Sequence, residues 1–251
     1  MTHLGQSPEK SSKDRAPRTL RQKLGRAKKN IFVAFFVDLI VIVATALVLS
    51  LLVKTFLLRS FFIPSGSMET TLMIDDRIIV NELVPEVVPI ERGDVIVFQD
   101  PGSWLGTPDV VTRTPLEQIG DFFLSSFGLI APDSKQHLVK RVIGMPGDHI
   151  VCSGPDAKLA INGVELNEIY VAKGAKPCGM AFDVTVPANS IWAMGDNRDN
   201  SADSRYHQDL PSKGFVDLKY VVGRAFVVSF PVSHWTWLDN YSNVYKDVPK
   251  P

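Results

Sequence analysis

An apolar run over residues 31–53 constrains this chain more than any other feature of its sequence. Asp38 is the single charged residue among its 23 residues. As an α-helix rising about 1.5 Å per residue, the run would span roughly 35 Å, enough for a bilayer core of about 30 Å. A buried core helix and a cleaved signal peptide are the alternatives, but the apolar part of a signal peptide is usually about 7 to 15 residues long. We therefore expect one N-terminal transmembrane helix over 31–53.

The charges are distributed unevenly around this run. Residues 1–30 hold nine Lys/Arg and two acidic residues, whereas the rest of the chain holds 18 basic and 25 acidic residues. A basic tail can bind nucleic acid, but a tail beside a membrane span is better explained by the positive-inside rule. We expect residues 1–30 to be a disordered cytoplasmic tail, residues 54–251 to be extracytoplasmic, and no nucleic-acid partner.

The remainder of the chain has the pattern of short β-strands. Runs rich in Val, Ile and aromatic residues occur at 77–81, 94–98, 138–143, 190–194 and 219–230. Asn162-Gly163 lies between apolar residues, which predicts a tight hairpin. Helical spacing is confined to 115–127. The fold class is therefore mainly β, an antiparallel β-sheet domain over 54–251 with a smaller insertion at about 102–136.

Two cysteines, Cys152 and Cys178, fall in the part expected outside the membrane, where a disulfide between them is favoured over two free buried thiols. Two cysteines alone cannot form a structural zinc site, and the five histidines lack HExxH spacing. We expect no metal and no cofactor.

Three segments carry residues suited to catalysis. The first is 63–68, Ile-Pro-Ser-Gly-Ser-Met, in which Pro64 and Gly66 predict a rigid turn that presents a hydroxyl. Backbone N–H groups at such a turn can form an oxyanion hole. Serines beside glycine in a loop are usually only solvated, so this segment does not identify a nucleophile by itself.

The second segment, 137–148, places Lys140 inside an apolar, strand-like run. Lysine in such a run usually points to solvent. If Lys140 points inward, burial lowers its pKa, and it can then act as a base. An ordinary lysine is only about 0.1% neutral near pH 7.5, and lowering its pKa by two to three units costs about 3 to 4 kcal/mol.

The third segment, 195–205, is crowded with turn formers and charges. A solvated loop or a calcium site at Asp196, Asn197, Asp199 and Asp203 is one interpretation. The order of acidic residues differs from that of a calcium loop, and two arginines would repel a cation. Charge-assisted Asp–Arg pairs that fix the loop are the better interpretation.

Together, Pro-Ser-Gly-Ser-Met (64–68), Lys-Arg-Val-Ile-Gly-Met-Pro-Gly-Asp (140–148) and Gly-Asp-Asn-Arg-Asp-Asn-Ser-Ala-Asp-Ser-Arg (195–205) resemble the motifs of bacterial type I signal peptidases, a Ser/Lys family. The resemblance covers most of 61–230. It implies endoproteolytic removal of signal peptides at the outer face of the bacterial plasma membrane. The partners that it implies are exported preproteins and the bilayer, with the secretion translocase as a candidate.

The resemblance also implies roles for individual residues. Ser67 is the nucleophile and Lys140 the general base. Ser65 joins the Ser67 N–H in the oxyanion hole, and Ser201 orients the amine. Asp203 and Arg205 hold the geometry of the loop. Apolar pockets for small substrate side chains would be built by Ile63, Pro64, Met68, Leu72 and Val139. In one departure from the family pattern, Thr70 stands where a proline is usual.

Other functions remain as alternatives. A self-cleaving Ser/Lys repressor would need a DNA-binding domain and no anchor. A Ser-His-Asp hydrolase would need a Gly-x-Ser-x-Gly turn, which we do not find. A catalytically silent, membrane-tethered binding protein with the same fold is the alternative from a different class.

Overall fold

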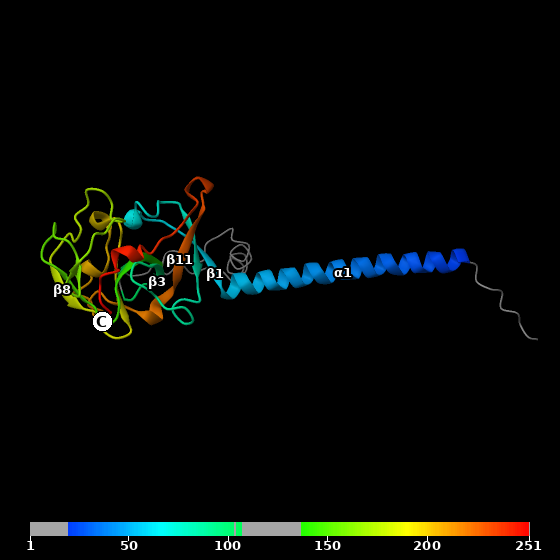
Figure 1. Ribbon diagram of the computed structural model, residues 1–251, viewed down its shortest axis with the longest axis horizontal. Helices are drawn as coiled ribbons and strands as arrows, with labels where there is room; N and C mark the ends of the chain where they lie inside the picture. The colour runs from blue at the N-terminus through cyan, green and yellow to red at the C-terminus, as the bar shows by residue number, and fades with distance from the viewer. Residues whose placement is uncertain (1–19, 103, 107–136, 251) are drawn as a thin grey trace, which may run out of the picture. The chain divides into compact units, whose positions relative to one another are not determined.

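The computed structural model describes residues 20–102, 104–106 and 137–250, with side chains of the first helix described for 32–50 (Figure 1). The chain forms two units, residues 1–50 and residues 51–251. Most of the predicted tail and of the predicted 102–136 insertion, including the helix expected at 115–127, lie outside the described residues.

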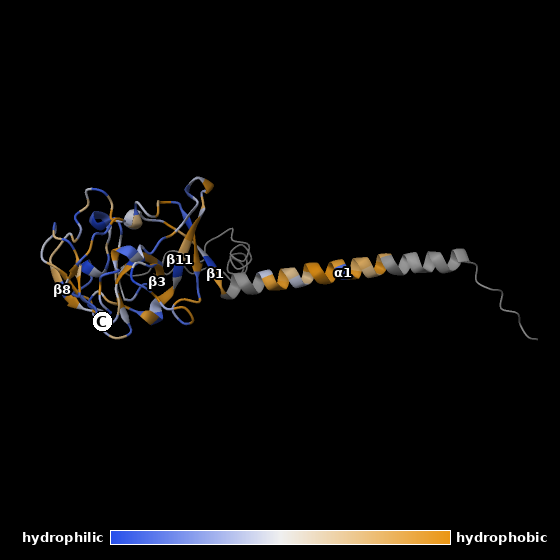
Figure 2. Cartoon of the chain, viewed as in Figure 1, coloured by the Kyte–Doolittle hydropathy of each residue, from blue (hydrophilic) through white to orange (hydrophobic). Residues whose placement is uncertain are grey.

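Helix α1, Leu20–Phe56, contains the apolar run. Its stretch Phe32–Ser50 has a mean hydropathy of 2.8, and none of it is buried within the protein (Figure 2). Thr45 donates its hydroxyl to the Val41 carbonyl one turn earlier, at 2.7 Å, so this polar group is satisfied inside the helix. By length and composition this helix can cross a bilayer.

The larger of two antiparallel sheets has eight strands, and the 140–148 segment singled out in the sequence begins on its central strand β4. Its order is β1-β2-β11-β3-β4-β9-β10, and β12 pairs with β11. The strands are β1 Leu58–Phe62, β2 Arg77–Asn81, β3 Val95–Gln99, β4 His137–Gly144, β9 Ser190–Met194, β10 Val216–Asp217, β11 Val221–Phe230 and β12 Thr236–Trp237. These strands confirm the mainly β, antiparallel class.

A second sheet, β7-β6-β5-β8, was not anticipated as a separate layer. It consists of β5 His149–Cys152, β6 Ala160–Ile161, β7 Val164–Glu165 and β8 Phe182–Thr185. Asn162 and Gly163 join β6 to β7 with φ of 51° and 82°, which confirms the predicted hairpin turn. Cys152 and Cys178 form a disulfide beside this sheet.

Short 3-10 helices connect the strands. They are η1 Gly66–Met68, η3 Arg198–Asn200, η4 Ser204–Tyr206, η5 Leu218–Tyr220, η6 Val232–His234 and η7 Ser242–Val244. The first three hold the residues singled out for catalysis. Strand β4 contacts η1 and strand β9 contacts η4. Both strands are mostly buried, so this part of the sheet gives the loops a rigid support.

Candidate active site

The turn that presents Ser67 is anchored in the core on both sides. Ile63 lies just after β1, and Met68 and Leu72 follow the serine; all three side chains are buried in one apolar cluster. The Ile63 N–H donates to the Asp76 carbonyl at 2.9 Å, which fixes the entry of the turn. Ser67 itself lies in η1 and is largely buried. Packing on both sides holds its hydroxyl in one place.

Strand β4 brings Lys140 to this hydroxyl. Nζ of Lys140 lies 2.7 Å from Oγ of Ser67, across 73 residues of sequence. Lys140 is only 4% exposed. The ladder between β3 and β4, in which Ile96 pairs with Lys140, fixes the strand that carries the amine. A hydroxyl and an amine at this separation can exchange a proton directly.

Burial lowers the pKa of the Lys140 amine to about 8. The carboxylates of Asp203 and Asp196 act in the opposite direction from a distance, and Arg205 lowers the pKa further. No carboxylate forms an ion pair with Lys140 among the described residues. At pH 8 about half of the amine is therefore neutral, whereas an ordinary lysine would be neutral in roughly 0.4% of molecules.

The loop after β9 holds the turn that carries Ser67. The Asn197 backbone N–H donates to the Ser67 carbonyl at 3.2 Å, and its side-chain amide donates to the Gly66 carbonyl at 3.0 Å. Gly195 permits this close approach, because a Cβ there would lie 2.4 Å from the Ser67 carbonyl oxygen. From the sequence, Asn197 was considered only as a calcium ligand. The one signal that could have indicated its contact with the turn was an amide side chain in a loop rich in turn formers.

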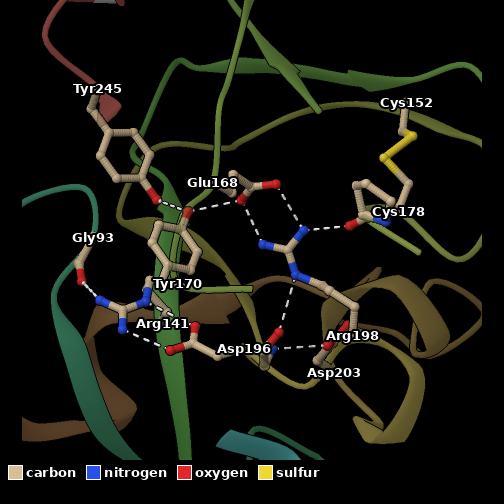
Figure 3. A network of polar contacts seen from close by, with 12 residues as sticks. Gly93, Arg141, Cys152, Glu168, Tyr170, Cys178, Asp196, Arg198, Asp203 and Tyr245 are labelled. Carbon is tan, nitrogen blue, oxygen red and sulfur yellow. Dashed lines mark hydrogen bonds and ion pairs between the residues drawn. A yellow bond between two sulfur atoms is a disulfide. The ribbon is translucent and has the colours of Figure 1, made fainter. Parts of the chain in front are cut away.

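Three arginine–carboxylate pairs, all at most 4% exposed at the side chain, hold this loop. Two of them, Arg141–Asp196 and Arg198–Glu168, are shown in Figure 3, and the third is Arg205–Asp203. In the last pair both oxygens of Asp203 accept from the Arg205 guanidinium at 2.8 Å. Burial alone would raise the pKa of Asp203, but the bonds from Arg205 hold it below its ordinary value.

These pairs agree with the predicted Asp–Arg interpretation of the loop rather than with the calcium alternative. Asp196 and Asp203 are both engaged by guanidinium groups, and no cluster of three His, Cys, Asp or Glu side chains in the described part of the chain is placed to hold a metal ion. The Asp–Arg interpretation describes the loop correctly.

Two further serines were expected to assist. Ser65 Oγ lies 3.4 Å from Ser67 Oγ, so it is beside the reacting hydroxyl. Ser201 is buried, and its hydroxyl has no hydrogen-bond partner of good geometry among the described residues. Its expected contact with the Lys140 amine is not among the bonds that the structure forms.

A cleft of about 180 Å³ opens beside the Ser67–Lys140 pair. Of the predicted wall residues, Ile63, Pro64, Met68 and Val139 line it, whereas Leu72 does not, because it is fully buried beneath the turn. The remaining walls come from residues that the sequence did not suggest: Phe61, Phe62, Leu105, His137 and Leu138. The cleft is mostly apolar, which suits small aliphatic substrate side chains.

A β-rich domain with a serine hydroxyl against a buried amine, beside an apolar cleft, has the arrangement of a serine peptidase that uses lysine in place of histidine. Comparison with known proteins identifies the family. The model for "Signal peptidase, peptidase S26" matches residues 36–230. The chain belongs to this family of signal peptidases and is a serine endopeptidase anchored to a membrane by its N-terminal helix.

Individual relatives agree with the family match. The signal peptidase I of Mycobacterium tuberculosis H37Rv is 37% identical over 215 residues, covering 78% of this chain and 72% of that protein. The signal peptidase I P of Bacillus subtilis subsp. natto is 30% identical over 215 residues, covering 82% and 93%. A crystal structure of a signal peptidase I from Enterococcus faecalis V583 is 28% identical, covers 54% of this chain and 95% of that one, and superimposes with a TM-score of 0.34.

Proposed function

We propose that this chain removes signal peptides from exported preproteins, with Ser67 as the nucleophile and Lys140 as its general base. The observation that carries the proposal is the 2.7 Å approach of Nζ to Oγ in a buried site. With Lys140 neutral, the Ser67 hydroxyl donates its hydrogen bond to Nζ. The amine then takes the proton as Oγ attacks the scissile carbonyl.

The tetrahedral oxyanion needs donors that are in place before the reaction. Ser65, whose hydroxyl lies 3.4 Å from Ser67 Oγ, and the Ser67 backbone N–H are the candidates. Protonated Lys140 then gives its proton to the leaving amine, and water hydrolyses the acyl-enzyme. The Asn197 bonds to the turn keep Ser67 in line during both steps.

The catalytic domain lies on the outer side of the membrane, with residues 1–30 inside. The basic charge of those residues supports this orientation. The disulfide between Cys152 and Cys178 supports it independently, since disulfides persist in oxidising compartments. Processing at that face makes the secretion translocase a neighbour and a candidate partner.

The domain also contacts lipid through the end of the β11–β12 hairpin. Trp235 and Trp237 are more than half exposed there, together with Phe230 and Val232, and aromatic side chains favour the bilayer interface. Phe61 and Trp104, by contrast, are buried in the core.

The test uses the full chain in detergent with a radiolabelled preprotein. We expect cleavage at one bond, identified by sequencing the new N-terminus, and no cleavage by Ser67→Ala. Ser153→Ala, at an exposed serine away from the cleft and from the β11–β12 hairpin, is the matched control and should keep full activity. Retention of cleavage by Ser67→Ala would contradict the proposal. A silent binding protein, for which the structure and the relatives give no support, would bind the preprotein and leave it intact.

A further inference from the structure

Asp76 closes the loop that carries Ser67. The Ile63 N–H donates to the Asp76 carbonyl at 2.9 Å, so the two ends of the segment 63–76 are bonded to each other. The Asp76 carboxylate adds a bond within the loop, since its Oδ2 accepts from the Met73 N–H at 2.8 Å. The nucleophile therefore lies in a closed loop whose base is Asp76.

The other oxygen of this carboxylate is bonded by a residue from a distant part of the sequence. Nδ1 of His234 lies 2.9 Å from Oδ1 of Asp76, across 158 residues. A carboxylate can only accept, so the imidazole donates. The Asp76 side chain is 2% exposed and the His234 side chain is 46% exposed, so the histidine covers the base of the loop from the solvent side. Hydrogen bonds to a charged acceptor are stronger than those between neutral groups.

His234 is itself held by the β11–β12 hairpin. It is the last residue of η6, which follows β11, and its N–H donates to the Pro231 carbonyl at 2.9 Å. The end of β11 pairs with β2, and Ser229 donates its hydroxyl to the Arg77 carbonyl at 3.1 Å. Because β2 begins directly after the loop, the hairpin and the base of the loop belong to one hydrogen-bonded unit.

The Ser67 hydroxyl needs a loop that keeps its position, because a shift of about 1 Å at a reacting group can cost about 10²-fold in rate. Asn197 holds the turn from the loop after β9, and Asp76 holds the base of the loop. We propose that His234 is a positioning residue for the cleavage reaction: by donating to Asp76, it keeps the Ser67 hydroxyl in place.

This inference rests on the proposed function and predicts a loss in kcat rather than in KM. Much of the cleft wall belongs to β1 and β4, outside the loop, including Phe61, Leu138 and Val139. Substrate binding should therefore be kept when the loop shifts. Proton transfer, by contrast, depends on the distance between Ser67 Oγ and Lys140 Nζ, so the chemical step should slow.

The readouts are kcat and KM of the full chain in detergent with the radiolabelled preprotein. We expect His234→Ala to lower kcat about tenfold and to leave KM within twofold of the wild-type value. His234→Asn should restore kcat to within threefold of the wild-type value, because its amide nitrogen can donate to Asp76 in place of Nδ1.

His149→Ala is the matched control. His149 forms the same kind of pair with Asp183, at 2.7 Å, but both side chains are at least half exposed. The pair joins β5 to β8 in the second sheet and does not line the cleft. The substitution should change neither kcat nor KM.

A kcat of His234→Ala within twofold of the wild-type value would overturn the inference. An equal loss of kcat in His234→Asn, or a loss confined to KM, would overturn it as well. In each of these cases the chain still cleaves the preprotein, and the proposed function stands. If the wild-type chain leaves the preprotein intact, the proposed function fails, and the role of His234 fails with it.

Discussion

Lys140 and Arg141 are neighbouring cationic residues on strand β4, and both are almost fully buried. Their hydrogen-bond and ion-pair partners are nevertheless different. Arg141 donates to both oxygens of Asp196, at 2.8 and 2.7 Å, and to the carbonyls of Gly93 and Asp239. The centroids of the Tyr170 and Tyr241 rings lie 4.4 and 5.1 Å from its guanidinium carbon. Lys140 forms a hydrogen bond with the Ser67 hydroxyl and no ion pair with a carboxylate among the described residues.

The pKa values follow from these surroundings. Burial lowers the pKa of both side chains, but Asp196 more than offsets burial at Arg141, whose pKa is raised above its ordinary value. At Lys140 burial prevails, and the pKa falls to about 8. Burial alone therefore does not determine the charge of a side chain; the partner does. By engaging Asp196, Arg141 also keeps that carboxylate from pairing with the Lys140 amine.

Replacing the lysine at position 140 by the other cation, arginine, should have the largest effect on activity. Lys140→Arg puts at position 140 a guanidinium that cannot lose its proton, so it cannot accept one from Ser67. We expect kcat/KM for preprotein cleavage to fall by about 10⁴-fold or more. The matched control is Lys173→Arg, at an exposed lysine, which should cleave normally. More than a few per cent of wild-type activity in Lys140→Arg would contradict the role of Lys140 as the base.

Removing the paired cation should instead affect stability first. Arg141→Gln leaves Asp196 buried without its counter-charge, and breaking a buried pair in this way costs about 3 to 5 kcal/mol. The free energy of unfolding, measured by denaturant titration near pH 7, should fall by that amount. Arg59→Gln serves as the control, because its pair with Glu82 is partly exposed, and it should cost no more than about 1 kcal/mol. If both variants lost the same free energy of unfolding, burial would not increase the contribution of the Arg141–Asp196 pair to stability.

The buried amine of Lys140, which has no carboxylate partner among the described residues, should destabilise the folded state while it is charged. Its folded pKa, about 8, lies below its ordinary value of 10.5. Between these values the unfolded chain binds a proton that the folded chain does not, so stability should rise with pH over this window. The difference in unfolding free energy between the wild type and Lys140→Met should rise by about 3 kcal/mol from pH 8 to 10.5. A difference that stays flat would mean that Lys140 keeps an ordinary pKa.

The pH dependence of kcat/KM should also report the pKa of the Lys140 amine, with a smaller change than the substitutions above. Only the neutral amine accepts a proton, so kcat/KM should fall about tenfold per pH unit below an apparent pKa of about 8 and level off above it. Asp203→Asn should move this limb to lower pH, because the Asp203 carboxylate raises the Lys140 pKa. If kcat/KM of the wild type instead rose with an apparent pKa near 10, the Lys140 amine would be solvated and the prediction would be wrong.

Much of the fold could be predicted because local pattern dictates it. The strands β2, β3, β4, β9 and β11 follow from runs of apolar and β-branched residues, and the Asn162-Gly163 turn follows from positive φ at both positions. The second sheet was not predicted, since β6 and β7 have only two residues each and carry no periodic signal of their own. Leu72 was placed in the cleft from its position in the chain, whereas packing buries it beneath the turn.

The sequence by itself determined which groups are present: an apolar run long enough to cross a bilayer, short strands, and three motifs with a serine, a lysine and paired charges. Tertiary structure decided what those groups can do. In the folded protein Ser67 contacts Lys140 across 73 residues of sequence, and Asp196 pairs with Arg141 rather than with Lys140. Folding also places Asn197 beside the Ser67 turn and Leu105 in the wall of the cleft. The reason is physical. Local propensity depends on neighbours along the chain, whereas the pKa of an amine and the walls of a cleft depend on neighbours in space.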